Sequence, residues 1–231
     1  MTIIYSDQGV LTGQRAVVGY RGQMCEVRLI GRAVANKLIR ENHYSRRTYN
    51  NSLHHFGVFV DGRLCGALQW GQAMNPASGG GIVKGAKIDQ WRELNRMWIS
   101  DDAPRNTESS AIAASVKVLR HIAPQVAFLQ SFADERCGGL GVVYQAASFG
   151  FFGSHIATFW RLDGEWFHNI AATAPKSTSG VRGMVLQGRI DEAERFDLRQ
   201  FRYLRFLKPW ARRACLLTEE PYPKPEPVEP A

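Results

Sequence analysis

The sequence ELNRMWISDDAPRNTESSAIAASVKVL, residues 93–119, decides the fold of this chain. Its first part alternates as the two faces of a strand do, with Leu94, Arg96 and Trp98 on one face and Asn95, Met97 and Ile99 on the other. Its last part places Ile112, Val116 and Leu119 at helical spacing. The segment between them is polar, so the sequence predicts a strand, a turn at 104–110 and a helix.

The turn at 104–110 has the position of the loop with which acyltransferases hold coenzyme A. A loop that cradles a pyrophosphate normally contains glycines, because backbone amides must approach the phosphates closely. Here the turn reads PRNTESS and contains no glycine. We therefore expect an acyltransferase-like fold whose turn is ill suited to acetyl-coenzyme A, although Ser109 and the amides at the helix start suit an anion or a carboxylate.

Length and composition favour a single domain. A chain of 231 residues with 45% hydrophobic content can bury one sizeable core, which we place at residues 1–218. Residues 219–231 contain five of the ten prolines, so we expect an extended or disordered tail. The N-terminus has no basic segment followed by an apolar one, and no run is long enough to span a bilayer, so we expect no membrane partner and a cytoplasmic location.

The charge of the chain points to a polyanionic partner. A net charge of +8 and a pI near 9.6 favour nucleic acid. Residues 195–213 interleave arginines with aromatic side chains, which fits phosphate contacts beside stacking surfaces. An equally weighted interpretation is a closing strand at 200–207 whose arginines are solvated. The arginines expected to bind DNA are Arg46, Arg47, Arg199, Arg202 and Arg205.

The cysteines and the order of elements indicate the class of fold. The four cysteines are far apart and form no C-x-x-C pair, so we expect buried, reduced thiols. A helix at 33–41 should bury Val34, Leu38 and Ile39, and Asp-Gly pairs at 61–62 and 163–164 predict two hairpins. This order of helices and strands predicts an α+β sheet whose faces are covered by helices.

Polar side chains stand where a site would form. His43 and Tyr44 lie side by side in a polar loop, and Asp134 follows a predicted strand, where sites in such sheets form. Mixed nitrogen and oxygen donors suit iron or manganese better than structural zinc. The plainer interpretation is that the loop pair is polar surface and that Asp134 forms a turn or a cap. Arg96, within the central strand, should meet a carboxylate, a phosphate or the sheet edge.

Two classes of enzyme do not match the sequence. Gly85 is followed by Ala86 rather than by Lys and then Ser or Thr, so the segment is not a P-loop. Residues 75–78, NPAS, lack the second proline and the aromatic residue of adenine methyltransferases. The chain is therefore expected to be neither a P-loop nucleotide-binding protein nor an ordinary methyltransferase.

Four segments resemble the Mom family of bacteriophage DNA-modification proteins: residues 42–47 (NHYSRR), 94–99 (LNRMWI), 131–134 (SFAD) and 143–151 (VYQAASFGF). The resemblance runs along the whole chain and implies a Gcn5-related N-acetyltransferase-like fold, with a mixed, mostly antiparallel sheet flanked by helices. It implies an enzyme that converts adenine in double-stranded DNA to N6-carbamoylmethyladenine and shields phage DNA from host restriction enzymes in the host cytoplasm. It also implies iron.

The resemblance places catalytic residues at Arg96, Ser109, Asp134 and Tyr144, and iron ligands at His43, Tyr44 and Asp134. Arg96 and Tyr144 would position a small-molecule donor whose identity the sequence leaves open.

The target adenine must leave the base stack, because N6 cannot reach a buried site inside a duplex. We expect the flipped base to stack on Tyr44 or Trp98. The sequence leaves two alternatives open, a coenzyme A-dependent N-acetyltransferase of a small amine or protein and a non-enzymatic DNA-binding protein. The oligomeric state is also open, with a homodimer as one option.

Overall fold

The computed structural model describes residues 4–6, 9–11, 13–137, 139–175, 177 and 179–225. These residues form a nine-stranded sheet and a separate hairpin of β1 (Ile4–Ser6) and β2 (Gly9–Leu11). In spatial order the sheet contains β10 (Glu165–His168), β9 (Gly150–Leu162), β11 (Glu194–Phe206), β8 (Phe128–Asp134), β7 (Trp91–Ile99), β6 (Arg63–Gly71), β5 (Ser52–Val60), β4 (Gln23–Leu29) and β3 (Gln14–Val18). Its neighbouring strands are antiparallel except for the parallel pair β7 and β8, which confirms the mixed, mostly antiparallel sheet.

Both predicted hairpins are confirmed. Asp61 and Gly62 have φ of 48° and 84°, and they join β5 to β6. Asp163 and Gly164 have φ of 51° and 76°, and they join β9 to β10. Two successive residues with positive φ make the tight turn that matches the twist of antiparallel strands, which is why an Asp-Gly pair predicts it.

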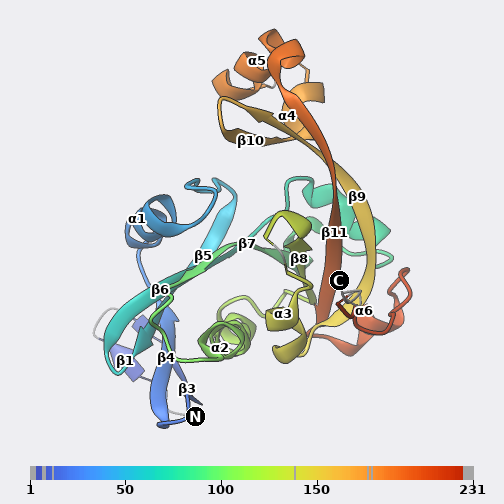
Figure 1. Ribbon diagram of the computed structural model, residues 1–231. Helices are drawn as coiled ribbons and strands as arrows, with labels where there is room; N and C mark the ends of the chain where they lie inside the picture. Colours follow the sequence, from blue (N-terminus) through green and yellow to red (C-terminus); the bar gives the residue numbers. More distant parts are fainter. Residues whose placement is uncertain are drawn as a thin grey trace, which may run out of the picture.

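Helices cover both faces of the sheet, as Figure 1 shows. Neighbouring residues of β6 point to opposite faces: Gln69 bonds to Asn36 of α1 (Arg32–Asn42), and Trp70 bonds to Ser115 of α2 (Thr107–Ile122). The larger core lies on the α2 side, where α3 (Val142–Ala146) also packs. The predicted α1 is confirmed, but its buried face is Ala35 and Ile39, so the burial expected for Val34 is wrong.

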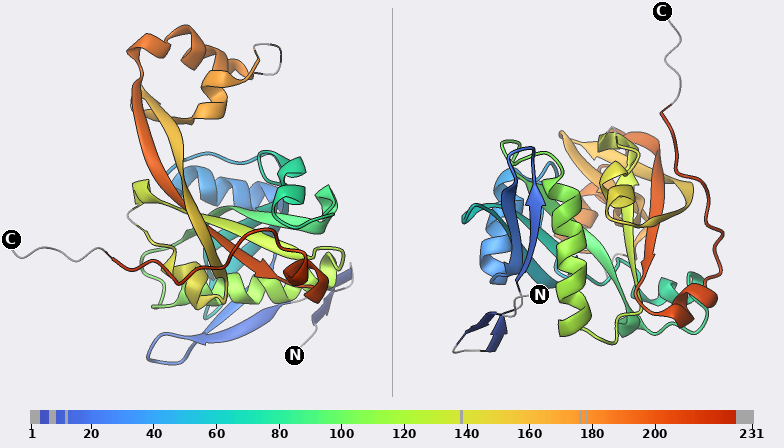
Figure 2. Two further views of the ribbon diagram at one scale, coloured as in Figure 1. Left: turned by 90° about the vertical axis from the view of Figure 1, so that its right-hand side faces the viewer. Right: turned by 90° about the horizontal axis from the view of Figure 1, so that it is seen from below.

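A long arm (residues 155–199) projects from the sheet beyond the end of β8, as Figures 1 and 2 show. It forms because β9 and β11 pair with each other over 13-residue strands, whereas β8 pairs only with residues 200–206 of β11. At its tip β10, α4 (Asn169–Thr173), α5 (Val181–Gly188) and η4 (Ile190–Glu192) bury a small cluster around Leu162, Phe167 and Leu186. The sequence predicted neither the tip helices nor the length of β9.

The C-terminal segment follows α6 (Pro209–Arg213) back along the domain. The Glu220 amide donates to Phe151 O at 2.9 Å, and the Tyr222 hydroxyl donates to Phe149 O at 2.8 Å. Residues 219–225 of the expected tail are therefore extended and bound to the domain, which corrects the expectation of disorder for them. Residues 226–231 lie outside the described residues.

Short helices complete the described chain: η1 (Pro76–Gly81) and η2 (Ile88–Gln90) precede β7, and η3 (Glu135–Cys137) follows β8. The thiols of Cys25 and Cys65 are buried and free, and that of Cys215 is half-buried. The side chain of Cys137 lies outside the description. Across the described ranges, none of the helices has the length and apolar character needed to cross a membrane.

Candidate active site

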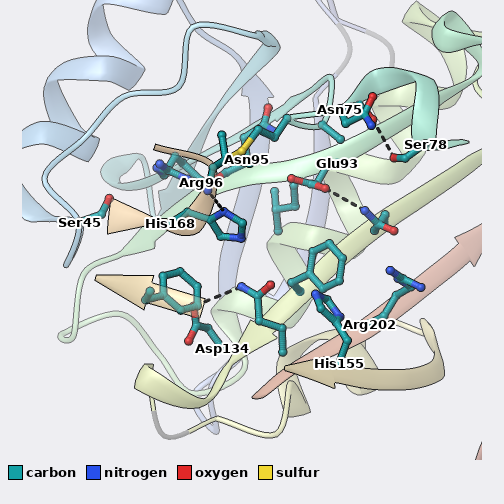
Figure 3. Close-up of a pocket in the computed structure, with 18 of the residues that line it drawn as sticks. Ser45, Asn75, Ser78, Glu93, Asn95, Arg96, Asp134, His155, His168 and Arg202 are labelled. Carbon is teal, nitrogen blue, oxygen red and sulfur yellow. Dashed lines mark hydrogen bonds between the residues drawn. The ribbon is translucent and has the colours of Figure 1, made fainter. Parts of the chain in front are cut away.

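The site forms where β7 and β8 separate. The two strands pair only from Trp91 to Glu93 and from Phe128 to Gln130, and beyond these residues they exchange no ladder bonds. Two cavities of about 600 and 560 Å³ occupy the gap. The first cavity, shown in Figure 3, extends under the arm, and the lining of the second extends to α3. Both are lined by Tyr44, Leu94, Asn95, Arg96, Phe132 and Asp134.

A bulge in β7 aims Arg96 into this gap. Opposite β6 the register shifts between Leu94 and Arg96, so Asn95 is an extra residue and the strict alternation expected for 94–99 is wrong. Consecutive residues of β7 therefore line the cavities. The Arg96 guanidinium donates to Arg47 O at 2.9 Å and to Asn95 O at 2.6 Å, and it lies over the Tyr49 ring. Burial lowers the pKa of Arg96, although the side chain stays charged.

His43 ends α1 at the second cavity, beside Tyr44. The imidazole is 7% exposed, and its Nδ1 accepts from the Ser45 amide at 3.1 Å. Burial, aided by the positive charge of Arg96, lowers the pKa of His43 to about 4, so the ring is neutral at pH 7. The Tyr44 ring packs 4.2 Å from the imidazole, centroid to centroid, and is 65% exposed.

Asp134 of β8 lines both cavities, and Tyr144 of α3 lines the second. Asp134 is 9% exposed, and both of its oxygens accept from the Arg136 guanidinium at 2.9 to 3.0 Å. The Tyr144 hydroxyl donates to Phe132 O at 3.3 Å, and its ring packs on Tyr203. The structure thus brings together five of the six residues that the resemblance assigned.

Ser109 is the sixth residue. Its hydroxyl donates to Asn106 O at 3.2 Å in the first turn of α2. Neither Ser109 nor Trp98 is among the described residues that line the two cavities. Of the two aromatic residues expected to stack on a base, Tyr44 therefore lies at the site.

The five arginines expected to bind DNA lie in different environments. Arg46 and Arg199 are exposed, and among the described residues neither guanidinium has an ion-pair partner. Arg47 forms an ion pair with Glu165 of the arm. Arg202 lines the first cavity, where its Nε is buried and has no hydrogen-bond partner in the described chain. Arg205 lies on the opposite side of β11 and donates to Ala147 O at 2.7 Å.

The first cavity also contains groups that no motif indicated. Glu93 of β7 accepts a hydrogen bond from Gln130 Nε2 at 2.9 Å. Burial raises the pKa of Glu93 to about 7, against the opposing effects of Gln130, Arg96 and Arg202. The arm contributes Phe159, Trp166, His155, His168 and Arg182. The sequence signal that could have identified Glu93 was a carboxylate inside a predicted buried strand, because burying an unpaired charge costs free energy.

The residues do not fit a preformed iron site. Within the described ranges, no three His, Cys, Asp or Glu side chains gather closely enough to hold a metal. His43 Nδ1 accepts from a backbone amide, which places the proton of the neutral ring on Nε2. Both oxygens of Asp134 are engaged by Arg136. Iron binding at His43, Tyr44 and Asp134 would require these partners to be exchanged.

Comparisons with known proteins identify the family. Methylcarbamoylase Mom of Escherichia phage Mu is 46% identical to this chain over 218 residues, which cover 93% of this chain and 90% of that protein. Among solved structures, an aminoglycoside acetyltransferase in complex with coenzyme A and kanamycin has a TM-score of 0.42 at 16% identity, covering 57% of this chain and 87% of its own. RimL, a ribosomal-protein acetyltransferase, has a TM-score of 0.46 at 9% identity, covering 89% and 100%. The Mom protein family matches residues 24–224, and this chain belongs to that family.

Proposed function

We propose that this chain is a DNA-modifying transferase that attaches a carbamoylmethyl group to N6 of adenine in double-stranded DNA. The observation that carries the proposal is its 46% identity to a methylcarbamoylase over almost the whole chain. The cavities between β7 and β8 support it, because they gather His43, Tyr44, Arg96, Asp134 and Tyr144.

The first cavity suits a base that has left the duplex. A volume of about 600 Å³ lies within the range of small-molecule sites. Enzymes that modify a base enclose it between aromatic or apolar side chains and read its edge with hydrogen bonds. Here Phe132, Phe159 and Trp166 provide the apolar walls, and polar groups of β7, β8 and β11 lie between them.

The charges around the first cavity suit a phosphate backbone at its mouth. The described lining contains five arginines and two carboxylates, and the arginines are Arg47, Arg96, Arg136, Arg182 and Arg202. We propose that exposed Arg46 and Arg199 hold the DNA beside the opening, whereas Arg205 supports α3 through Ala147.

The residues between the strands then have separate roles. Neutral His43 and the phenol of Tyr44 can form hydrogen bonds with the donor molecule or with the adenine amine. Arg96, fixed by two backbone carbonyls, presents a constant positive charge that can hold an oxygen of the donor. Asp134, held by Arg136, contributes its carboxyl group to the lining of both cavities.

Iron remains a proposal that rests on the family resemblance. His43, Tyr44 and Asp134 would supply mixed nitrogen and oxygen donors, with Asp134 released from Arg136. The proposed roles of the protein side chains do not depend on iron.

Restriction digestion tests the proposed function. DNA from bacteria that express the chain should resist restriction enzymes whose sites contain adenine, and enzymes whose sites contain only guanine and cytosine should still cut it. Asp134→Ala should remove the protection while the protein stays folded. Full sensitivity of the DNA, with abundant folded protein, would leave a non-enzymatic DNA-binding protein as the better explanation.

A further inference from the structure

The charged form of Glu93 is disfavoured where it lies, and no ion pair in the described part of the chain compensates for this. Glu93 lies on β7 at the last residue that pairs with β8, and burial disfavours its charged form. Arg96 and Arg202 are near enough to stabilise its charge, yet within the described residues Glu93 forms no ion pair. A half-buried carboxyl without an ion pair is disfavoured in its charged form, and such groups concentrate at functional sites.

The two oxygens of Glu93 have different surroundings. Oε2 accepts the hydrogen bond from Gln130, whose side chain is itself 3% exposed and therefore fixed. Oε1 accepts no hydrogen bond from a described residue, and it is not fully enclosed. Figure 3 shows Glu93 and Arg202 among the residues that line the first cavity. One oxygen is thus held in place while the other is available to a ligand.

The open oxygen requires a ligand that donates a hydrogen bond. Adenine carries a donor at its exocyclic N6 and acceptors at N1 and N7 beside it. Guanine, in contrast, carries a carbonyl oxygen at the corresponding position, which would face the carboxyl oxygen unfavourably. Phe132, whose ring lies beside the Arg202 guanidinium, supplies an apolar wall close to this position.

We propose that Glu93 binds the exocyclic amine of the flipped adenine through Oε1, with Gln130 holding the carboxyl in place. Glu93 is then the residue that distinguishes a purine with a 6-amino group from one without it. The inference rests on the proposed function, since it names the group that recognises the substrate of that reaction.

Analogues of the target base test the proposal in a binding assay. Duplexes carry adenine, purine or hypoxanthine opposite an abasic site, so that loss of base pairing costs the same in each, and affinity is measured by fluorescence anisotropy. At pH 8, where Glu93 is mainly a carboxylate, we expect the parent protein to prefer adenine over purine by at least about 10-fold, as for one hydrogen bond to a charged group, and to bind hypoxanthine most weakly.

Variants of Glu93 test whether this residue causes the preference for adenine. Glu93→Ala should lose it, and Glu93→Gln should weaken it, because the amide offers a single accepting oxygen to both Gln130 and the amine of adenine. Glu41→Ala, an exposed glutamate of α1, is the matched control and should behave as the parent. Circular dichroism confirms that each variant is folded.

The outcomes separate the two claims. A Glu93→Ala protein that keeps the parent's preference overturns the proposed role of Glu93, even if the parent modifies adenine in cells. A parent that neither prefers adenine nor modifies DNA overturns the proposed function itself.

Discussion

Glu93→Gln should stabilise the protein, and more so at alkaline pH. The pKa of Glu93 is raised from an ordinary value of 4.5 to about 7, so the folded state holds a proton that the unfolded state releases. Stability must therefore fall as the pH rises from about 4.5 through about 7. At about 1.4 kcal/mol per pH unit, the loss has an upper bound of about 3.5 kcal/mol. Replacement by a neutral amide removes this loss.

The assay is urea unfolding of the parent and Glu93→Gln proteins at pH 5 and pH 8. The stability advantage of Glu93→Gln should be larger at pH 8 by up to about 3 kcal/mol, which corresponds to roughly 6–12 °C in midpoint temperature for a chain of this size. Glu41→Gln, whose glutamate is exposed, should show no such pH-dependent difference. An equal advantage at both pH values would refute the raised pKa of Glu93.

Three further predictions concern Asp134 and the arginines. Asp134→Ala should abolish base modification in cells and leave the fold intact, as nucleoside analysis and circular dichroism can show; retained activity would make Asp134 a turn former. Arg136→Gln should raise ferrous iron content, measured by elemental analysis, because it frees the Asp134 carboxylate, and Asp134→Ala should lower it; equal iron in parent and Asp134→Ala proteins would exclude this ligand. DNA affinity should fall steeply with salt concentration, and a double Arg46→Ala, Arg199→Ala variant should show a smaller slope. Arg205→Ala should lower the stability of the protein and leave the slope unchanged. An unchanged slope in the double variant would show that Arg46 and Arg199 do not contact phosphates.

Local chemistry explains the parts of the fold that the sequence predicted well. An Asp-Gly pair favours positive φ at both turn positions, so both hairpins were predictable without knowledge of the rest of the chain. The central strand and the following helix were also predictable from their periodicities. These features depend on neighbours in sequence.

The features that the sequence did not predict depend on pairing between strands that are distant in the chain. The extra residue at Asn95 arises from its register against β6, so the alternation holds from Arg96 to Ile99 but does not place Leu94 on the face of Arg96. The arm exists because β9 and β11 pair beyond the end of β8, a non-local contact without a sequence signal.

The candidate site was only partly predictable. Family resemblance named His43, Tyr44, Asp134 and Tyr144, and the structure places them at the same pair of cavities. It gave no reason to select Glu93, because a single glutamate in a strand has no motif, and its role depends on Gln130 and on burial that only the fold creates.

Mass analysis of deoxynucleosides from bacteria that express this chain tests the proposed modification of adenine without an intermediate assay. We predict a deoxyadenosine in which one hydrogen of the exocyclic amine is replaced by a carbamoylmethyl group, and we predict its absence from cells that express Asp134→Ala. An acetylated deoxyadenosine would instead indicate a coenzyme A-dependent acetyltransferase. Unmodified deoxyadenosine, in cells that contain abundant folded protein, would contradict the account.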